Sequence, residues 1–255
     1  MAIEIFTRKE QKYLITKEQY TLLMEQIMPW MRADKFGEDG RYTVTSLYFD
    51  SNDHTIYFET KNKLKFRQKL RLRVYNQTDL AGTSFFEVKQ KHKKVVNKRR
   101  MLLPLLEAYR YLDDAGNDYI NFADYDASNQ QVFREIDYFL TLYTLRPTMI
   151  VSYDRHALHG LYDPELRITC DLNLRCRDDD LSLEHGAFGE HFIDPNLVVL
   201  EVKVNDSVPL WLTRILQALD CQQRSASKYC TSMELLKGEE LPIQTTKEYE
   251  FAGGR

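Results

Sequence analysis

Basic side chains alternate with mostly apolar ones over residues 63–75, which read KLKFRQKLRLRVY. In an extended strand, successive side chains point to opposite faces of the sheet, so five of these cations share one face. They are Lys65, Arg67, Lys69, Arg71 and Arg73. Neighbours in such a row lie about 7 Å apart, where like charges repel by roughly 0.6 kcal/mol in water and roughly 2.4 kcal/mol at an effective dielectric of 20. The row therefore predicts a binding site for an anion.

Four other segments repeat this alternation of charged and apolar positions. Their residues on the charged side are Glu87, Lys89, Lys91 and Lys93; Tyr153 and Arg155; Arg167, Asp171, Asn173, Arg175 and Arg177; and Glu201 and Lys203. An acid and a base also stand two residues apart in three places, at Glu10 and Lys12, at Glu87 and Lys89, and at Glu201 and Lys203. Charge of both signs is thus expected on one side of the sheet.

Two interpretations fit such strands. An alternating strand commonly has one face in water. Five of them with clustered arginines favour the second interpretation, in which helices cover the apolar faces and the charged faces line an interior. Such an interior is stable when its charges are paired or bind an ion. Arginine forks and lysine ammonium groups suit the oxygens of a triphosphate or phosphate chain, and carboxylates among them suit a divalent cation that bridges phosphates.

Composition argues against a general nucleic-acid binder. The chain has 255 residues, of which 43% are hydrophobic, enough for one large domain with a substantial core. Its 35 Lys and Arg are balanced by 38 Asp and Glu, for a formal charge of −3, whereas nucleic-acid-binding domains usually carry a net positive charge. The cations are concentrated in residues 61–100. We therefore expect a phosphate compound and no nucleic acid.

The sequence also predicts a cytoplasmic location. No run approaches the 18 apolar residues of a membrane-spanning helix, and the first residues, MAIEIFTRKEQKY, lack the apolar core of a signal peptide. The cysteines show neither C-x-x-C spacing nor a histidine partner at metal-site spacing, so reduced, buried thiols are expected. They are Cys170, Cys176, Cys221 and Cys230.

The elements that must position these side chains follow from pattern. Strands are predicted at 41–50, 55–61, 63–75, 83–91, 95–103, 148–158, 165–177 and 196–205, which are rich in β-branched and aromatic residues. Helices are predicted after Thr16 to about Pro29, at 104–114, at 128–145, after Pro209 and at 226–237. The apolar side of the first helix is predicted to carry Leu22, Leu23, Ile27 and Met28.

This order of elements predicts an α+β fold built on a large antiparallel sheet or closed barrel. The strands do not alternate regularly with helices, as they would in a doubly wound parallel sheet. Neither G-x-G-x-x-G nor G-x-x-x-x-G-K-[ST] occurs, so no glycine-rich phosphate loop is expected. We predict a single domain over residues 1–237 and a disordered tail over 238–255.

A set of short motifs resembles a known family. In order, they are RKEQKYLI, SLYFD, KLRLRVY, FFEVKQK, NKRR, VSYDRHAL, LRITCDLNL, LEVKV followed by VPLWL, and SASKY. Their order and spacing, over roughly residues 5–237, resemble the VTC domain. That domain is the polyphosphate polymerase of the vacuolar transporter chaperone complex and its prokaryotic relatives, within the triphosphate tunnel metalloenzyme superfamily.

The resemblance implies an eight-stranded antiparallel β-barrel tunnel with helices packed outside. In it, ATP or another nucleoside triphosphate would donate its terminal phosphoryl group to a growing polyphosphate chain. The basic phosphate ligands implied by matching motif are Lys12, Arg71, Arg73, Lys89, Lys98, Arg155 and Arg167. Lys69, Lys91 and Lys203 join them because they share the charged faces.

The resemblance also implies a metal and a catalytic lysine. Glu201 would hold Mn²⁺ or Mg²⁺, with Glu10 and Glu87 as the next candidates. Lys228 would lie near the transferred phosphate and act with Arg71 and Arg73, although a lysine in a predicted helix is by default solvated. One departure is Arg8, which replaces the first acid of the E-x-E-x-K pattern of the wider superfamily and suits the polymerase branch.

Two alternatives stay open at this point. One is a triphosphatase of the same fold that hydrolyses inorganic or organic triphosphate. The other is a non-catalytic module that binds polyphosphate or pyrophosphate. The family also suggests a separate membrane protein as partner, which would place the chain at the cytoplasmic face of a membrane. The sequence leaves the preferred nucleotide, the metal, the product length and the oligomeric state open.

Overall fold

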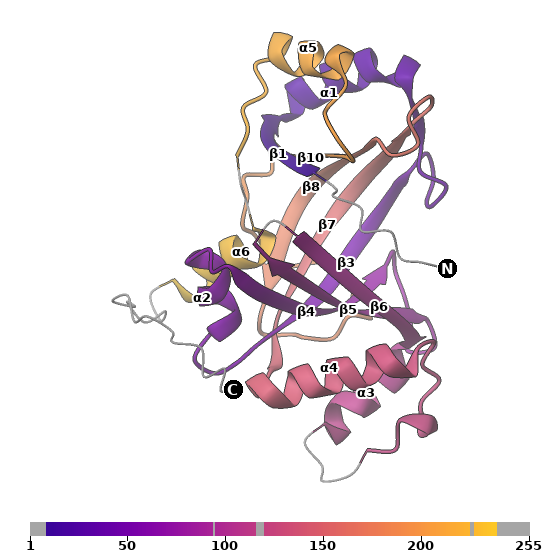
Figure 1. Ribbon diagram of the computed structural model, residues 1–255, viewed down its shortest axis with the longest axis vertical. Helices are drawn as coiled ribbons and strands as arrows, with labels where there is room; N and C mark the ends of the chain where they lie inside the picture. Colours follow the sequence, from indigo (N-terminus) through magenta and orange to yellow (C-terminus); the bar gives the residue numbers. More distant parts are fainter. Residues whose placement is uncertain (1–8, 94, 116–119, 225–226, 239–255) are drawn as a thin grey trace.

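The computed structural model describes residues 9–93, 95–115, 120–224 and 227–238, and it is built on one antiparallel sheet (Figure 1). Eight strands follow one another along the sheet in the order β1 (Lys9–Thr16), β10 (Leu197–Val204), β8 (Arg167–Arg177), β7 (Arg146–Gly160), β3 (Arg41–Asp50), β4 (Phe66–Tyr75), β5 (Thr83–His92) and β6 (Val95–Pro104). Two short strands, β2 (Met31–Ala33) and β9 (Glu190–His191), pair with β7 and β8. The predicted antiparallel α+β architecture is confirmed.

The closed eight-stranded barrel is not confirmed. The sheet has ten strands, and within the described residues its two end strands, β1 and β6, do not pair with each other. Both free edges have other partners. Gln223 forms a bridge with Tyr13 of β1, and the Ser128 backbone N–H donates to the Leu102 carbonyl of β6 at 2.9 Å. Loop backbone thus occupies edge positions that would otherwise be available for closure.

The sheet nevertheless curls strongly, and its register places the predicted charges on one side (Figure 1). Lys12 stands opposite Glu201, and Arg71 stands opposite Glu87. Lys89 on β5 interacts electrostatically with Glu10, although β5 and β1 are not neighbours in the sheet. We call this side the charged face. The alternation predicted from sequence is therefore the alternation that β1, β4, β5 and β10 adopt.

Helices cover the opposite, apolar side in two places (Figure 1). Helices α1 (Lys17–Ile27) and α5 (Leu210–Ala218) pack on β1, β8 and β10 around buried side chains such as Leu23 and Leu212. Helices α3 (Leu105–Asp114) and α4 (Gln130–Tyr143) pack on β4, β5 and β6. The remaining helices are α2 (Thr55–Lys61), α6 (Lys228–Lys237), η1 (Met28–Trp30) and η2 (Phe122–Asp124). Packing on the outer, apolar side of the sheet is thus observed for α1, α3, α4 and α5.

Two predictions about individual elements were wrong. The segment 55–61, predicted as a strand, is helix α2, because its apolar residues Ile56, Tyr57 and Phe58 are consecutive and all become buried against neighbouring elements. The predicted start of α1 after Thr16 is confirmed, but Leu22 is exposed, and so is Met28, which lies in η1. Residue 8 and the tail from 239 onward lie outside the described residues, so the domain boundaries stay a prediction.

The predicted alternation along β8 also fails after Asp171. Asn173 has a φ of 49°, and the register with β7 shifts at this point. Beyond the shift, the Arg177 side chain is buried and donates to backbone carbonyls, including those of Asp180 and Ser182. Arg177 therefore stabilises a loop and does not belong to the charged face.

Candidate phosphate-binding and active site

Glu201, in the middle of β10, is the centre of a first group of charges. Its buried carboxylate receives ammonium groups at 3.1 Å from Lys12, 3.1 Å from Lys203 and 3.4 Å from Lys228. Lys12 also lies 3.0 Å from Glu10. Burial alone would raise the pKa of Glu201, but the cations around it outweigh burial and hold that pKa well below its ordinary value. Glu201 is therefore an ionised carboxylate enclosed by cations.

Asp171 on β8 extends this group. Arg155 forms two bonds with its carboxylate, from Nε to Oδ1 at 2.7 Å and from Nη2 to Oδ2 at 2.9 Å. Lys228 Nζ lies 2.6 Å from the same Oδ2, so this lysine bridges Asp171 and Glu201. Its side chain is only 10% exposed, and the two acids raise its pKa although burial lowers it. This geometry excludes the default interpretation that Lys228 is a solvated surface lysine.

The start of α6 brings Lys228 onto the charged face. Ser227 caps the helix, and its hydroxyl accepts from the Cys230 backbone N–H at 3.3 Å and from Lys69 Nζ at 2.9 Å. The Tyr229 hydroxyl donates to Asp50 at 2.5 Å, and its ring stacks on Tyr48 with 5.2 Å between centroids. Unlike the four outer helices, α6 therefore begins on the charged face and is tied there by buried contacts.

Glu87 on β5 is the centre of a second group. Its carboxylate, 1% exposed, receives Arg71 at 2.6 Å, Lys98 at 2.5 Å and Arg100 at 2.5 Å. Arg73 lies farther away, at 3.7 Å. Burial raises the pKa of Glu87, but the four cations outweigh it and lower that pKa far below its ordinary value. Four cations around one carboxylate leave this group with excess positive charge.

The other predicted phosphate ligands fall into two sets. Lys69 and Lys89 lie between the two groups on β4 and β5, where burial lowers the pKa of both. Lys91 lies two residues beyond Lys89 and forms no ion pair within the described part of the chain. Arg167 lies at the far end of β8, where its guanidinium pairs with Asp34 at 3.0 Å. The structure thus brings most of the predicted residues together and leaves Lys91 and Arg167 at the margin of the charged face.

Tyrosines lie among the arginines of the charged face. The Tyr48 hydroxyl accepts from Arg71 at 3.3 Å, and the Tyr153 hydroxyl accepts from Arg73 at 3.2 Å. Burial raises the pKa of Tyr48, but the adjacent Arg71 and Arg73 outweigh burial and lower it to about 8. Both arginines are thereby held in place by neutral acceptors that a phosphate can replace.

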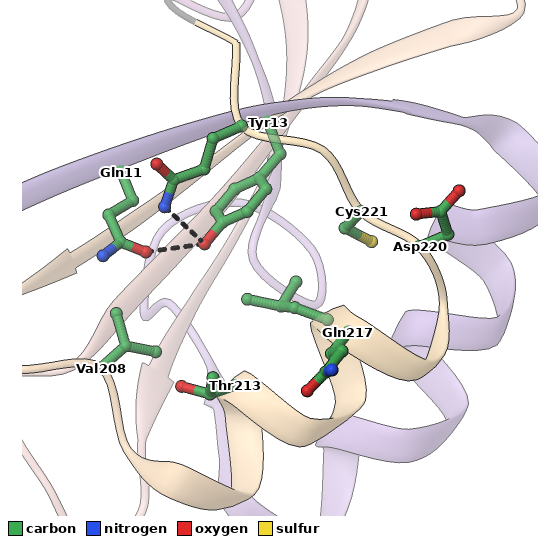
Figure 2. A pocket seen from close by; sticks show the side chains of 9 residues that line it. Gln11, Tyr13, Val208, Thr213, Gln217, Asp220 and Cys221 are labelled. Atoms are coloured by element: carbon green, nitrogen blue, oxygen red, sulfur yellow. Dashed lines mark hydrogen bonds between the residues drawn. The ribbon is translucent and has the colours of Figure 1, made fainter.

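A separate hollow of about 410 Å³ lies on the other side of β1, beside α5 (Figure 2). Gln11 and Tyr13 line it, and they alternate along β1 with Glu10 and Lys12 of the charged face. The Tyr13 hydroxyl donates to Gln11 at 2.6 Å, and Gln223 donates to the same hydroxyl at 3.4 Å (Figure 2). The described residues that line the hollow include Asp220 and no lysine or arginine, which distinguishes it from a phosphate site.

Comparison with known proteins identifies the family. The VTC domain matches residues 7–237. This chain belongs to the VTC domain family. Two relatives named vacuolar transporter chaperone complex subunit 4 are similar to it. The one from Trypanosoma cruzi is 23% identical over 222 residues, covering 71% of this chain and 27% of the relative, and the one from Trypanosoma brucei brucei is 21% identical over 283 positions, covering 92% and 35%.

This VTC domain therefore spans about a third or less of the curated relatives it matches. Among solved structures, the PH1819 protein from Pyrococcus Horikoshii OT3 aligns with a TM-score of 0.44 and 12% identity, over 91% of this chain and 99% of that chain. Within the described residues of the VTC domain, no helix is both long and apolar enough to cross a bilayer.

The acids of the VTC domain fit a divalent cation that arrives with phosphate. Within the described ranges, no three His, Cys, Asp or Glu side chains gather closely enough to hold a metal by themselves. Mg²⁺, however, is usually held by one or two carboxylates together with waters and substrate phosphates. Glu201 offers such oxygens, since it shares Lys12 with Glu10 and Lys228 with Asp171. Glu87 is less available because its cations lie closer, at 2.5 to 2.6 Å for Arg71, Lys98 and Arg100.

Sequence reasoning missed three residues of this site. Asp171 was placed on the charged face of its strand but given no function, although it holds both Arg155 and Lys228. Arg100, the last residue of NKRR, was not chosen although it contacts Glu87. Tyr48, in SLYFD, was also missed. Only Asp171 had a usable signal, namely an acid in an otherwise basic row.

Proposed function

We propose that this VTC domain transfers the terminal phosphoryl group of ATP, or of another nucleoside triphosphate, to a growing polyphosphate chain on its charged face. One observation carries the proposal. Cations outnumber acids on this face, and nearly all lie on rigid strands with their side chains directed to the same side of a curled sheet. A linear phosphate chain is the ligand that such an arrangement matches best.

The residues of each group have distinct tasks in this reaction. Arg71 and Arg73 exchange Glu87 and the tyrosine hydroxyls for phosphate oxygens and hold the chain in register. Lys228, the one member supplied by a helix, moves from its two acids to the transferred phosphate. An acceptor oxygen forms a bond to the terminal phosphorus, the bond from that phosphorus to its bridging oxygen breaks, and the nucleoside diphosphate leaves with the electron pair. Catalysis then consists of positioning and charge neutralisation.

A divalent ion, Mn²⁺ or Mg²⁺, would be held by Glu201 with Glu10 or Asp171 as second carboxylate. When bound, it would offset part of the negative charge of the phosphates. The names of the relatives indicate subunits of a complex. We therefore include a membrane-bound partner subunit in the proposal, which would place this domain at the cytoplasmic face of a membrane.

The test is incubation of the purified chain with ATP and Mn²⁺ or Mg²⁺, followed by gel separation and polyphosphate staining. Long products that depend on the metal support the proposal. Free phosphate without chain growth would instead indicate a triphosphatase, and tight polyphosphate binding without either product would indicate a binding module. Lys228→Ala is the matched negative variant, expected to keep ATP binding and to lose about tenfold or more in turnover. Arg214→Ala, on the outer surface of α5, is the control.

A further inference from the structure

Thr169 lies at the centre of the charged face. It stands directly opposite Glu201 in the pairing of β8 with β10, and it precedes Asp171 by two residues on the same side of β8. Because residues two apart on a strand share a face, the three side chains point to one side of the sheet. The Thr169 side chain therefore lies on the charged face beside both carboxylates.

Among the residues that the structure describes, the Thr169 hydroxyl has no hydrogen-bond partner. The residue is 0% exposed, and its Oγ1 is buried without a hydrogen bond. A hydroxyl that folding removes from water and leaves unpaired is unfavourable, and valine has nearly the same shape without this cost. A polar group kept at such a position is expected to gain its partner from outside the chain.

In the structure, the Lys228 ammonium group contacts both of these carboxylates. Its Nζ lies 2.6 Å from Asp171 and 3.4 Å from Glu201, the two acids that flank Thr169. If Lys228 moves to a phosphate, the position that its ammonium group occupies between Glu201 and Asp171 becomes available beside the Thr169 hydroxyl. Arg155 stays on Asp171, and Lys12 and Lys203 stay on Glu201. Carboxylates with a threonine or serine hydroxyl are a common oxygen set for Mg²⁺ beside phosphates.

We infer that the Thr169 hydroxyl is a third oxygen ligand, with Glu201 and Asp171, for a divalent cation that binds together with a nucleoside triphosphate. The nature of the ligand rests on the proposed function, but the binding test below needs no turnover. Failure of polyphosphate synthesis and failure of this inference are therefore separate outcomes.

The test compares Thr169→Val, which removes the hydroxyl, with Thr169→Ser, which keeps it. The probe is a hydrolysis-resistant ATP analogue, titrated by calorimetry with and without Mn²⁺. In the wild type and in Thr169→Ser, Mn²⁺ is expected to increase the affinity for the analogue. In Thr169→Val, this increase should be smaller by at least about tenfold. The affinity for the analogue without Mn²⁺ should be the same in all three proteins. In the absence of any ligand, Thr169→Val should unfold about 2 to 4 °C higher than wild type.

Ser152→Ala is the matched control. Its hydroxyl is also fully buried and unpartnered, but Ser152 pairs with Thr45 on the other side of the sheet. It should gain thermal stability in the same way and keep the full effect of Mn²⁺. An unchanged Mn²⁺ effect in Thr169→Val would overturn the inference. So would a lower melting temperature of that variant without ligand, since the hydroxyl would then have a partner within the protein.

Discussion

At the scale of single residues, the charged face consists of buried carboxylates that hold several cations in place. Glu87 and Glu201 are each buried among several cations. Removing such a carboxylate would leave its partners uncompensated, which is costly in a buried setting. Because most of these cations are already oriented by an acid, a phosphate chain would meet prepared donors and spend little free energy on ordering side chains.

Arg71→Ala and Arg73→Ala should each weaken tripolyphosphate binding without unfolding the protein. Each removes a charge-assisted hydrogen-bonding fork worth about 1.5 to 3 kcal/mol, which corresponds to roughly a 10- to 150-fold loss of affinity. Calorimetry on the folded variants measures the loss. Arg99→Ala is the control, because Arg99 alternates with Lys98 and Arg100 on β6 and pairs with Glu135 of α4 instead. Unchanged affinity in both test variants would contradict the proposed site.

Tyr48 should make the affinity for tripolyphosphate depend on pH. Its pKa is lowered from the usual 10 to about 8, so above pH 8 a phenolate forms in the folded protein and pairs with Arg71. The unfolded chain keeps that proton up to about pH 10, so Tyr48 adds folding stability as the pH rises from 8 to 10 and loses it as the pH falls through 8.

The same phenolate competes with phosphate for Arg71, so affinity should fall as the pH rises above 8. In Tyr48→Phe this part of the pH dependence should disappear, which a calorimetric titration series from pH 7 to 10 measures. The absorbance of tyrosinate near 295 nm reports the ionisation directly. If the two proteins lose affinity in parallel, the lysines of the face and not Tyr48 account for the effect.

At the scale of elements, helix α6 differs from the other helices because its first residues lie on the charged face. Asp50, at the end of β3, accepts from the backbone N–H groups of Ile56 and Tyr57 and from the Tyr229 hydroxyl. One buried carboxylate thus joins the end of a strand, the start of α2 and the start of α6. This junction fixes the direction from which Lys228 reaches its acids.

Tyr229→Phe should therefore lower turnover more than binding. The variant keeps the stack on Tyr48 and loses a hydrogen bond to a carboxylate, about 1.5 to 3 kcal/mol of unfolding free energy. We expect a several-fold lower kcat for chain growth with an unchanged KM for ATP, because Lys228 is held less firmly. Tyr57→Phe, which removes only a 3.4 Å bond between α2 and Glu234 of α6, is the matched control. Equal effects in both variants would place the defect in general stability.

At the scale of the whole molecule, the chain separates its charges. The formal charge is −3, yet the curled sheet collects cations on one side. Like charges gathered in this way repel one another, so the free protein is less stable than it would be with a bound polyanion. Binding to the folded state alone must then stabilise it.

Tripolyphosphate should accordingly raise the melting temperature. At 100 times its Kd it adds about 2.7 kcal/mol, or roughly 5 to 10 °C for a chain of this size. A matched concentration of duplex DNA should have little effect, because the cations lie on the inner side of a curled sheet and the net charge is negative. Thermal unfolding with each polyanion measures the difference, and equal shifts would indicate non-specific charge attraction.

The sequence by itself determined what local pattern controls. The two-residue period of the strands predicted which of Lys69, Arg71 and Arg73 share a face, and this was correct because side-chain direction in a strand is a local property. The start of a helix after Thr16 was predicted for the same reason, and the structure adds a capping box there. Segment 55–61 shows the limit, since its β-branched and aromatic residues suit a strand but its neighbours bury it as a helix.

Tertiary structure decided the contacts between distant segments. Lys228 is separated from Asp171 by 57 positions, and no local pattern shows that a helix start lies on the sheet beside that acid. Tertiary contacts also decided that the sheet does not close, because loop residues Ser128 and Gln223 occupy the free edges of β6 and β1. Such pairings depend on the relative free energies of alternative long-range contacts, which alternation and capping signals along the chain do not contain.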